Sequence, residues 1–162
     1  MIELNYNRNA AVEYANRWAM GRNPAYFNFD RYGGDCTNFA SQCIYSGSGV
    51  MNYTPQVGWY YRSSYDRTAS WTGVEYLYNF LISNRLAGPY AIVVNENDAL
   101  PGDIVQLGDS TENFYHSPVI TAIYPEILVA AHTVNSINRP LSSYIYDTAR
   151  FLHIVGVRKY LP

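Results

Sequence analysis

The segment GGDCTNFASQC at residues 33–43 decides how the fold is interpreted, because two glycines and an acid lead directly into a helical pattern. Its cysteines, Cys36 and Cys43, are the only two in the chain. They could form a disulfide, bind a metal ion, fill the core, or include a nucleophile. The spacing and surroundings of the two residues separate these alternatives.

Residues 36–46 are predicted to form a helix, with Asp35 as its cap and Gly47 as its stop. A helix holds two residues seven positions apart at a distance of about 10 Å. A disulfide requires Cα atoms within about 7 Å. We therefore expect two free thiols. A zinc site is also disfavoured, because zinc-binding cysteines usually have only two to four residues between them, whereas six separate Cys36 from Cys43.

The two cysteines differ in their surroundings. Cys43 lies among apolar residues such as Phe39 and Ile44, and buried free cysteine behaves as a small hydrophobe, so a core position is expected. Cys36 begins the helix, where the macrodipole and free backbone N–H groups favour a thiolate and can hold an oxyanion. The glycines before it permit unusual backbone angles. The charge of Asp35 opposes a thiolate, which favours its role as a helix cap.

A thiol nucleophile needs a histidine to take its proton and a polar group to orient that histidine. His116 opens a predicted strand and His132 ends the next one. Neighbouring antiparallel strands could place them side by side, with His132 hydrogen bonded to the ring of His116. Asn113 and Asn135 are alternatives for the orienting role. His153 lies in mid-strand and is expected to be a satisfied core histidine. From these residues alone, a Cys–His pair is as readily coincidental as catalytic.

The pattern along the chain changes from helical to β. Apolar spacing predicts helices at residues 10–20, 36–46 and 72–83. The first would be capped by Asn9, and the last by a capping box of Thr72 and Glu75. Five β-branched runs then predict strands, at 90–94, 103–107, 118–124, 127–133 and 151–160. Helices first and strands later indicate an α+β fold, with the helices packed on an antiparallel sheet.

Composition limits the class of protein. The length of 162 residues predicts a single domain over 1–162, and 48% hydrophobic with 15% charged residues is typical of a globular chain. The net charge is -2 and no run of Lys or Arg occurs, so nucleic acid is not an expected partner. No apolar run approaches the roughly 18 residues of a membrane span. The first residues lack the pattern of a signal peptide, although an export signal could lie upstream of an excised domain.

The aromatic segment GWYYRSSYDRTASW at residues 58–71 stands out in a chain with 17 tyrosines. Trp59, Tyr60, Tyr61 and Trp71 could wall a substrate cleft. They could equally form a packed loop that covers the sheet, because amphipathic aromatic rings often serve packing.

Several motifs together resemble a known family. GGDCTNFASQC, SW at 70–71, LPGDIVQLGD, HSPVITAI and AHT occur in the order found in a bacterial putative amidase domain family. The likeness runs from about Tyr6 to Arg158. That family belongs to the papain-like cell-wall hydrolase superfamily, alongside NlpC-type and CHAP domains. The resemblance implies a papain-like core in which the helix that carries the cysteine packs on an antiparallel sheet that carries the histidines.

The resemblance also implies an activity. Cys36 matches the nucleophile, His116 the base, and His132 the polar third residue of the family. These roles imply hydrolysis of an amide in bacterial cell-wall peptide through a thioester, with no metal or organic cofactor, outside the cell or at the wall. A catalytically silent peptide-binding module and a thiol acyltransferase are the alternatives. The candidate substrate contacts are Asp35, Asn38, Trp59, Tyr60 and Trp71, and the candidate additional oxyanion donors are Asn38, Gln42 or a nearby tyrosine.

Overall fold

Four helices form in the first half of the chain in this computed structural model, which describes residues 1–162. Their bounds are α1 Arg8–Trp18, α2 Cys36–Ser48, α3 Ala69–Thr72 and α4 Val74–Ser83. Each of the three predicted helices is therefore present, with each end either as predicted or shifted by two residues, and α3 is an additional short turn. None of the helices combines the length and apolar character that crossing a membrane requires.

One antiparallel sheet of eight strands takes up most of the second half. Its path runs β1-β10-β5-β7-β8-β9, with β4 also paired to β10 and β6 to β5. The bounds are β1 Ile2–Leu4, β4 Gly88–Val94, β5 Ile104–Gly108, β6 Phe114–His116, β7 Val119–Ala122, β8 Leu128–Ala131, β9 Ser136–Pro140 and β10 Thr148–Lys159. The remaining elements are the hairpin of β2 Tyr61–Ser63 and β3 Asp66–Arg67, and the 3₁₀ turns η1 Glu96–Asp98 and η2 Leu141–Ser143. The predicted α+β class is confirmed.

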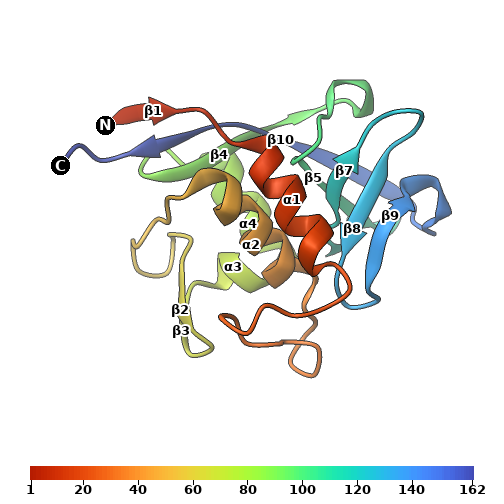
Figure 1. Cartoon of the computed structure of the whole chain (residues 1–162), viewed down its shortest axis with the longest axis horizontal. Helices are drawn as coiled ribbons and strands as arrows, with labels where there is room; N and C mark the ends of the chain where they lie inside the picture. The colour runs from red at the N-terminus through yellow and green to blue at the C-terminus, as the bar shows by residue number, and fades with distance from the viewer.

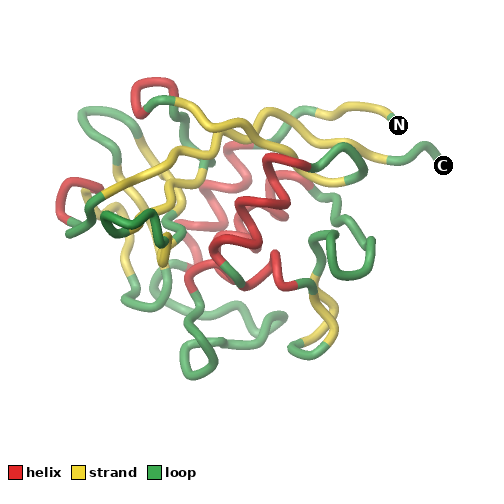
Figure 2. The backbone as a smooth tube through the Cα atoms, turned by 180° about the vertical axis from the view of Figure 1, so that it is seen from behind, coloured by secondary structure: helices red, strands yellow, loops and turns green.

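The helices gather beside the curled sheet, with α1 crossing in front of α2 and α4 in the view of Figure 1. Seen from behind in Figure 2, the long strand β10 runs across the upper part of the molecule toward the end marked C. The first and last strands lie side by side, with Ile2 opposite Lys159, so both termini meet at one edge of the sheet.

Helix α2 lies at the centre of the core. Every residue from Cys36 to Ile44 is buried, because α2 is enclosed by the other helices and the sheet. Phe39 and Ile44 pack in one cluster with Leu152 and Ile154 of β10. Cys43 belongs to the same cluster and has no exposed surface, so its predicted core position is confirmed. Both cysteines are free, as helical spacing predicted.

Two predicted helix ends are wrong by two residues. Asn7, not Asn9, caps α1, because its side chain accepts a hydrogen bond from Ala10 N at 3.0 Å. Gly49, not Gly47, ends α2, with the left-handed φ of 63° that glycine permits. Gly47 stays inside the helix, where a side chain would collide with the ring of Tyr6. Gly47 matters here because it has no side chain, which leaves room for the chain before α1 to pack on α2.

The predicted capping box is also wrong. Gly73 separates α3 from α4, and no side chain caps α4. Glu75 instead accepts a hydrogen bond from Arg150 on β10 at 2.7 Å, which ties the first turn of α4 to the sheet. An acid at this position still interacts favourably with the positive end of the helix dipole.

The aromatic segment is mainly a packed loop. Trp59 and Trp71 are 0% exposed, and their rings pack together with centroids 4.7 Å apart. The Trp59 indole donates a hydrogen bond to Ser41 Oγ at 3.0 Å, so burial leaves its polar group satisfied. Tyr60 is half-buried and donates to Asp66 at 3.1 Å. Both tryptophans are enclosed by the core, which favours the packed-loop alternative over a cleft wall.

Candidate active site

Cys36 begins α2 after two glycines with left-handed backbone angles. Gly33 and Gly34 have φ values of 94° and 98°, which side-chain-bearing residues rarely adopt. A Cβ on Gly34 would stand 3.3 Å from Thr133 Oγ1, in the turn that follows β8. That hydroxyl also accepts a hydrogen bond from Asp35 N at 3.2 Å. The glycines therefore allow the turn before Cys36 to press against the end of the sheet.

Asp35 occupies the cap position, but its side chain does not cap α2. Its carboxylate accepts hydrogen bonds from Phe29 N and Asn38 Nδ2, each at 2.9 Å, and lies 2.6 Å from His132 Nδ1. Arg22 Nε adds an ionic contact at 3.3 Å. Burial alone would raise the pKa of Asp35, but the bonds from His132, Asn38 and Phe29 outweigh burial and hold this pKa below its ordinary value. The predicted cap is wrong because the carboxylate turns toward the histidine.

His132 is buried and binds the carboxylate of Asp35 through Nδ1. Its other ring nitrogen, Nε2, lies 2.7 Å from the carbonyl oxygen of Trp18, and its ring stacks on Phe39 with centroids 3.9 Å apart. These two contacts engage both ring nitrogens. No ring nitrogen remains for His116. The expected His132–His116 hydrogen bond is therefore absent, because Asp35 and Trp18 take up both nitrogens.

The thiol of Cys36 lies in a network of hydroxyl and amide groups. Its Sγ is 3.7 Å from Thr37 Oγ1, which lies 3.2 Å from Ser117 Oγ. Gln106 Nε2 donates to the same Ser117 hydroxyl at 3.1 Å. Burial raises the pKa of the Cys36 thiol above its ordinary value of 9.0, while hydrogen bonds from Thr37 and from the Ser117 backbone act in the opposite direction. The resting group is thus a thiol, although its helix position was expected to favour a thiolate.

The position of His116 relative to Cys36 follows from the contacts of its neighbour, Ser117. It ends β6, rather than opening a strand as predicted, and the next residue, Ser117, contacts Cys36 and Thr37. Burial, with a smaller contribution from the charge of Arg139, lowers the pKa of His116 from 6.5 to about 4. No hydrogen bond joins its ring to Cys36 or to any other group. The ring is therefore neutral near pH 7 and both its nitrogens are free.

The three histidines now have distinct places. His132 is fixed by Asp35, and His153 Nδ1 lies 2.9 Å from Asp103 Oδ2, so His153 is held through one ring nitrogen, although it is half-buried rather than in the core as predicted. Only His116 keeps both of its ring nitrogens free. The alternatives for its orienting partner, Asn113 and Asn135, are exposed and form no side-chain hydrogen bond to it. The neighbour that packs on its ring is Tyr144, with ring centroids 5.6 Å apart.

The predicted polar contacts of α2 support the core rather than face an opening. Asn38 is buried and donates to Phe27 O and Asp35, while its own oxygen accepts from the Trp71 indole at 3.0 Å. Gln42 is buried as well and accepts a hydrogen bond from Tyr14. The Asn38 amide is therefore not free to donate to an oxyanion in this conformation, whereas only the oxygen of Gln42 is engaged.

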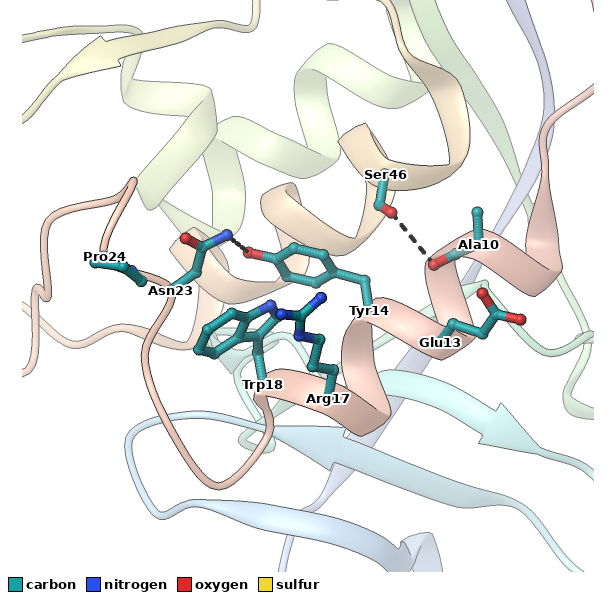
Figure 3. Close-up of a pocket in the computed structure, with 8 residues that line it drawn as sticks. All are labelled: Ala10, Glu13, Tyr14, Arg17, Trp18, Asn23, Pro24 and Ser46. Carbon is teal, nitrogen blue, oxygen red and sulfur yellow. Dashed lines mark hydrogen bonds between the residues drawn. The ribbon is translucent and has the colours of Figure 1, made fainter.

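The largest cavity lies away from Cys36. It has a volume of about 590 Å³ and opens between α1, the loop after it and the end of α2. In Figure 3, Tyr14 points across it toward Asn23, and Ser46 meets the backbone of Ala10. Neither Cys36 nor His116 lines this or any other cavity. The size of the cavity is therefore no guide to the chemistry, and the reactive groups are better located by their own contacts.

Sequence reasoning missed three polar residues around the thiol. Thr37 and Ser117 each directly follow a predicted catalytic residue, so adjacency alone could have suggested them. Gln106 is a polar residue within the apolar strand DIVQL and is fully buried, a combination that usually requires hydrogen-bonding partners. Its oxygen accepts from Arg150 Nε at 2.8 Å. No group of three or more His, Cys, Asp or Glu side chains is arranged to hold a metal ion.

Comparison with known proteins gives the class to which this fold and site belong. Residues 5–155 match the family described as “Putative amidase domain”, so the chain belongs to that family, which points to a hydrolase acting on amide bonds. The chain is also similar to “Uncharacterized protein YhbB” of Bacillus subtilis (strain 168), with 35% identity over 122 residues. The match covers 72% of this chain but 37% of that relative. No solved structure matches the chain.

Proposed function

We propose that the chain is a papain-like cysteine amidase that uses Cys36 as the nucleophile and His116 as the base. One observation carries the proposal. His116 alone among the histidines has both ring nitrogens free, and the residue next to it contacts the Cys36 side of the site through Thr37. A movement of the β6–β7 connection would be needed to bring the imidazole to the sulfur, and catalytic hydrogen bonds often tighten only when substrate binds.

Proton transfer would accompany attack. The high pKa of the thiol and the low pKa of the imidazole favour a neutral resting pair. As Cys36 Sγ bonds to the amide carbon, its proton passes to His116, which then gives it to the leaving amine as the C–N bond breaks. Water, deprotonated by His116, attacks the thioester carbon and releases the carboxylate and the thiol.

The first turn of α2 would stabilise the oxyanion. Its first intrahelical backbone bond runs from Phe39 N to Asp35 O, so the N–H groups of Cys36, Thr37 and Asn38 precede the helical ladder. Asp35 does not cap them, because its carboxylate is bound to His132. His132 would thus act as a positioning residue through Asp35, and not as the orienting partner of His116. Uncapped N–H groups at a helix start favour an anion.

A bacterial cell-wall peptide is the substrate that we propose, with the protein outside the cell or at the wall. The support is the amidase description of the family together with the motifs that resemble cell-wall hydrolases. The alternative is a catalytically silent peptide-binding module. The observation in its favour is that Cys36 is only 9% exposed and forms no hydrogen bond to His116. A thiol acyltransferase would share the acyl-enzyme and differ only in the acceptor.

Mass spectrometry of a peptidoglycan digest tests the proposal. The wild type should release new amine and carboxylate ends, while Cys36→Ala and His116→Ala should release none. Cys43→Ala is the matched thiol control, because Cys43 lies in the core, and it should keep activity if it folds. Digestion by the Cys36→Ala protein would refute the thioester route. Muropeptide binding without turnover by the wild type would favour the binding module, and products with an added amine would identify an acyltransferase.

A further inference from the structure

A fixed positive charge lies beside His116. Arg139 of β9 places its guanidinium carbon 3.7 Å from the centre of the Tyr144 ring, and the same ring packs against His116 with centroids 5.6 Å apart. Ser143 holds the guanidinium in place, since Nε donates to its hydroxyl at 2.8 Å and Nη2 to its carbonyl at 3.2 Å. The orientation of the charge is therefore set by the protein.

This charge has no anionic partner. No carboxylate lies within 4.0 Å of Arg139, and its Nη1 group has no hydrogen-bond acceptor. Arg150 differs from Arg139 in this respect. It also stacks on aromatic rings, but it forms an ion pair with Glu75 at 2.7 Å. The Tyr144 hydroxyl is buried and lacks a partner too. Buried polar groups without partners are rare in folded proteins. An oriented, half-buried guanidinium with an unused Nη1 group is an arrangement suited to an anion.

We propose that Arg139 binds a carboxylate of the substrate close to the scissile amide, so that peptides with an acidic group beside this bond are preferred. The inference rests on the proposed function, because it places the carboxylate next to the base, His116. A guanidinium suits this role because its planar N–H groups match a carboxylate and stay charged at all relevant pH values. The acidic group can be a free α-carboxylate or an acidic side chain, which share this chemistry.

The same contact would activate the base. The charge of Arg139 contributes to the low pKa of His116. A bound carboxylate would compensate that charge, because an anion nearby favours the protonated imidazole. His116 would then accept the thiol proton more readily once an acidic substrate is bound. Neutral substrates would leave the charge uncompensated and the base weak.

Three peptides that share one cleavable amide test the preference. The first carries a free α-carboxylate, the second an acidic side chain with an amidated end, and the third neither group. Wild type should cleave one acidic peptide at least about tenfold faster in kcat/KM than the neutral one, the size expected for a charged hydrogen bond. Arg139→Gln should lose this preference and should cleave the neutral peptide faster than wild type does, because the charge that weakens His116 is removed, while Arg139→Lys should keep part of the preference. Arg62→Gln, which removes another tyrosine-stacked arginine, should change nothing.

Binding gives a readout that does not need turnover. In Cys36→Ala protein, NMR titration of the His116 ring should show a higher pKa when the acidic peptide is present than when the neutral peptide is present. The double variant with Arg139→Gln should show no such difference. If neither peptide is cleaved by wild type but this response occurs, the proposed hydrolysis fails and the carboxylate site stands. Equal cleavage of all three peptides, or an unchanged His116 pKa with Arg139 intact, overturns the inference even if Arg139→Gln does not fold.

Discussion

His132 Nδ1 lies 2.6 Å from Asp35 Oδ2, which links the end of β8 to the residue that immediately precedes Cys36. Both side chains are almost completely buried. A buried pair of this kind holds its two segments in one arrangement, because separating the partners would leave a charge or a polar group unsatisfied. The position of Cys36 near the end of β8 therefore depends on a histidine that does not contact the sulfur.

Replacing His132 by Ala should lower the free energy of unfolding by about 3–5 kcal/mol, because the buried Asp35 carboxylate loses its closest partner. Urea unfolding followed by tryptophan fluorescence measures this loss. Asp35→Asn provides the matched variant, since it keeps the shape of the side chain and removes the charge. A change below about 1 kcal/mol in His132→Ala would mean that the pair contributes no more than an exposed ion pair.

His116 should make the protein less stable in mild acid. Its pKa is about 4 in the folded protein and 6.5 ordinarily, so the unfolded chain binds the extra proton between these values. The stabilising contribution is therefore fully present above pH 6.5 and is lost as the pH falls toward 4. Urea unfolding at pH 7, 5.5 and 4.5 should show a shallower pH dependence for His116→Gln than for wild type. Parallel curves for the two proteins would exclude this contribution, and His153→Gln serves as the histidine control.

The two thiols should differ in alkylation by iodoacetamide. Cys36 lies at the start of α2 with slight exposure, whereas Cys43 is fully enclosed, so Cys36 should react first in the folded protein. The reaction should be slow at pH 7 and should accelerate with pH up to values above 9, because burial raises the thiol pKa and only the thiolate reacts. Peptide mapping after timed labelling distinguishes the sites. Equal slow labelling of both thiols would argue strongly against Cys36 as a nucleophile.

The sequence predicted the general architecture because the signals for it are local. Apolar spacing located α1, α2 and α4, and β-branched runs located β4, β5, β7, β8 and β10. The seven-residue spacing of Cys36 and Cys43 was enough to exclude a disulfide. Boundaries were less accurate, since Gly47 was interpreted as a stop although tertiary packing against Tyr6 keeps it inside the helix.

The partners within the site could not be predicted in the same way. Strand order suggested that His132 would lie against His116, but the sequence contains no information on which way each ring turns. The orientation of the His132 ring is set by long-range contacts, because Asp35 is 97 positions from His132 and Trp18 is 114 positions from it. Arg139 gave no local signal at all, because its significance depends on the Tyr144 ring that it shares with His116.

Gly34→Ala should destabilise the turn that delivers Cys36 to the site. Gly34 has a φ of 98°, where a side chain costs about 1–2 kcal/mol, and its new Cβ would stand 3.3 Å from Thr133 Oγ1. Relief of that strain would move Asp35, whose backbone N–H binds the same hydroxyl, and would carry Cys36 with it. We expect a lower free energy of unfolding together with an altered rate of Cys36 alkylation.

Gly21→Ala is the control for this substitution, because Gly21 has no positive φ and its Cβ would meet no atom within 4 Å. It should leave the unfolding free energy unchanged within about 0.5 kcal/mol, as for other surface changes. Two measurements on both variants, urea unfolding and timed labelling of Cys36, separate the outcomes. Loss of stability with unchanged labelling would show that the turn yields without moving the sulfur. Wild-type behaviour of Gly34→Ala in both assays would show that the left-handed angle is not needed to position Cys36.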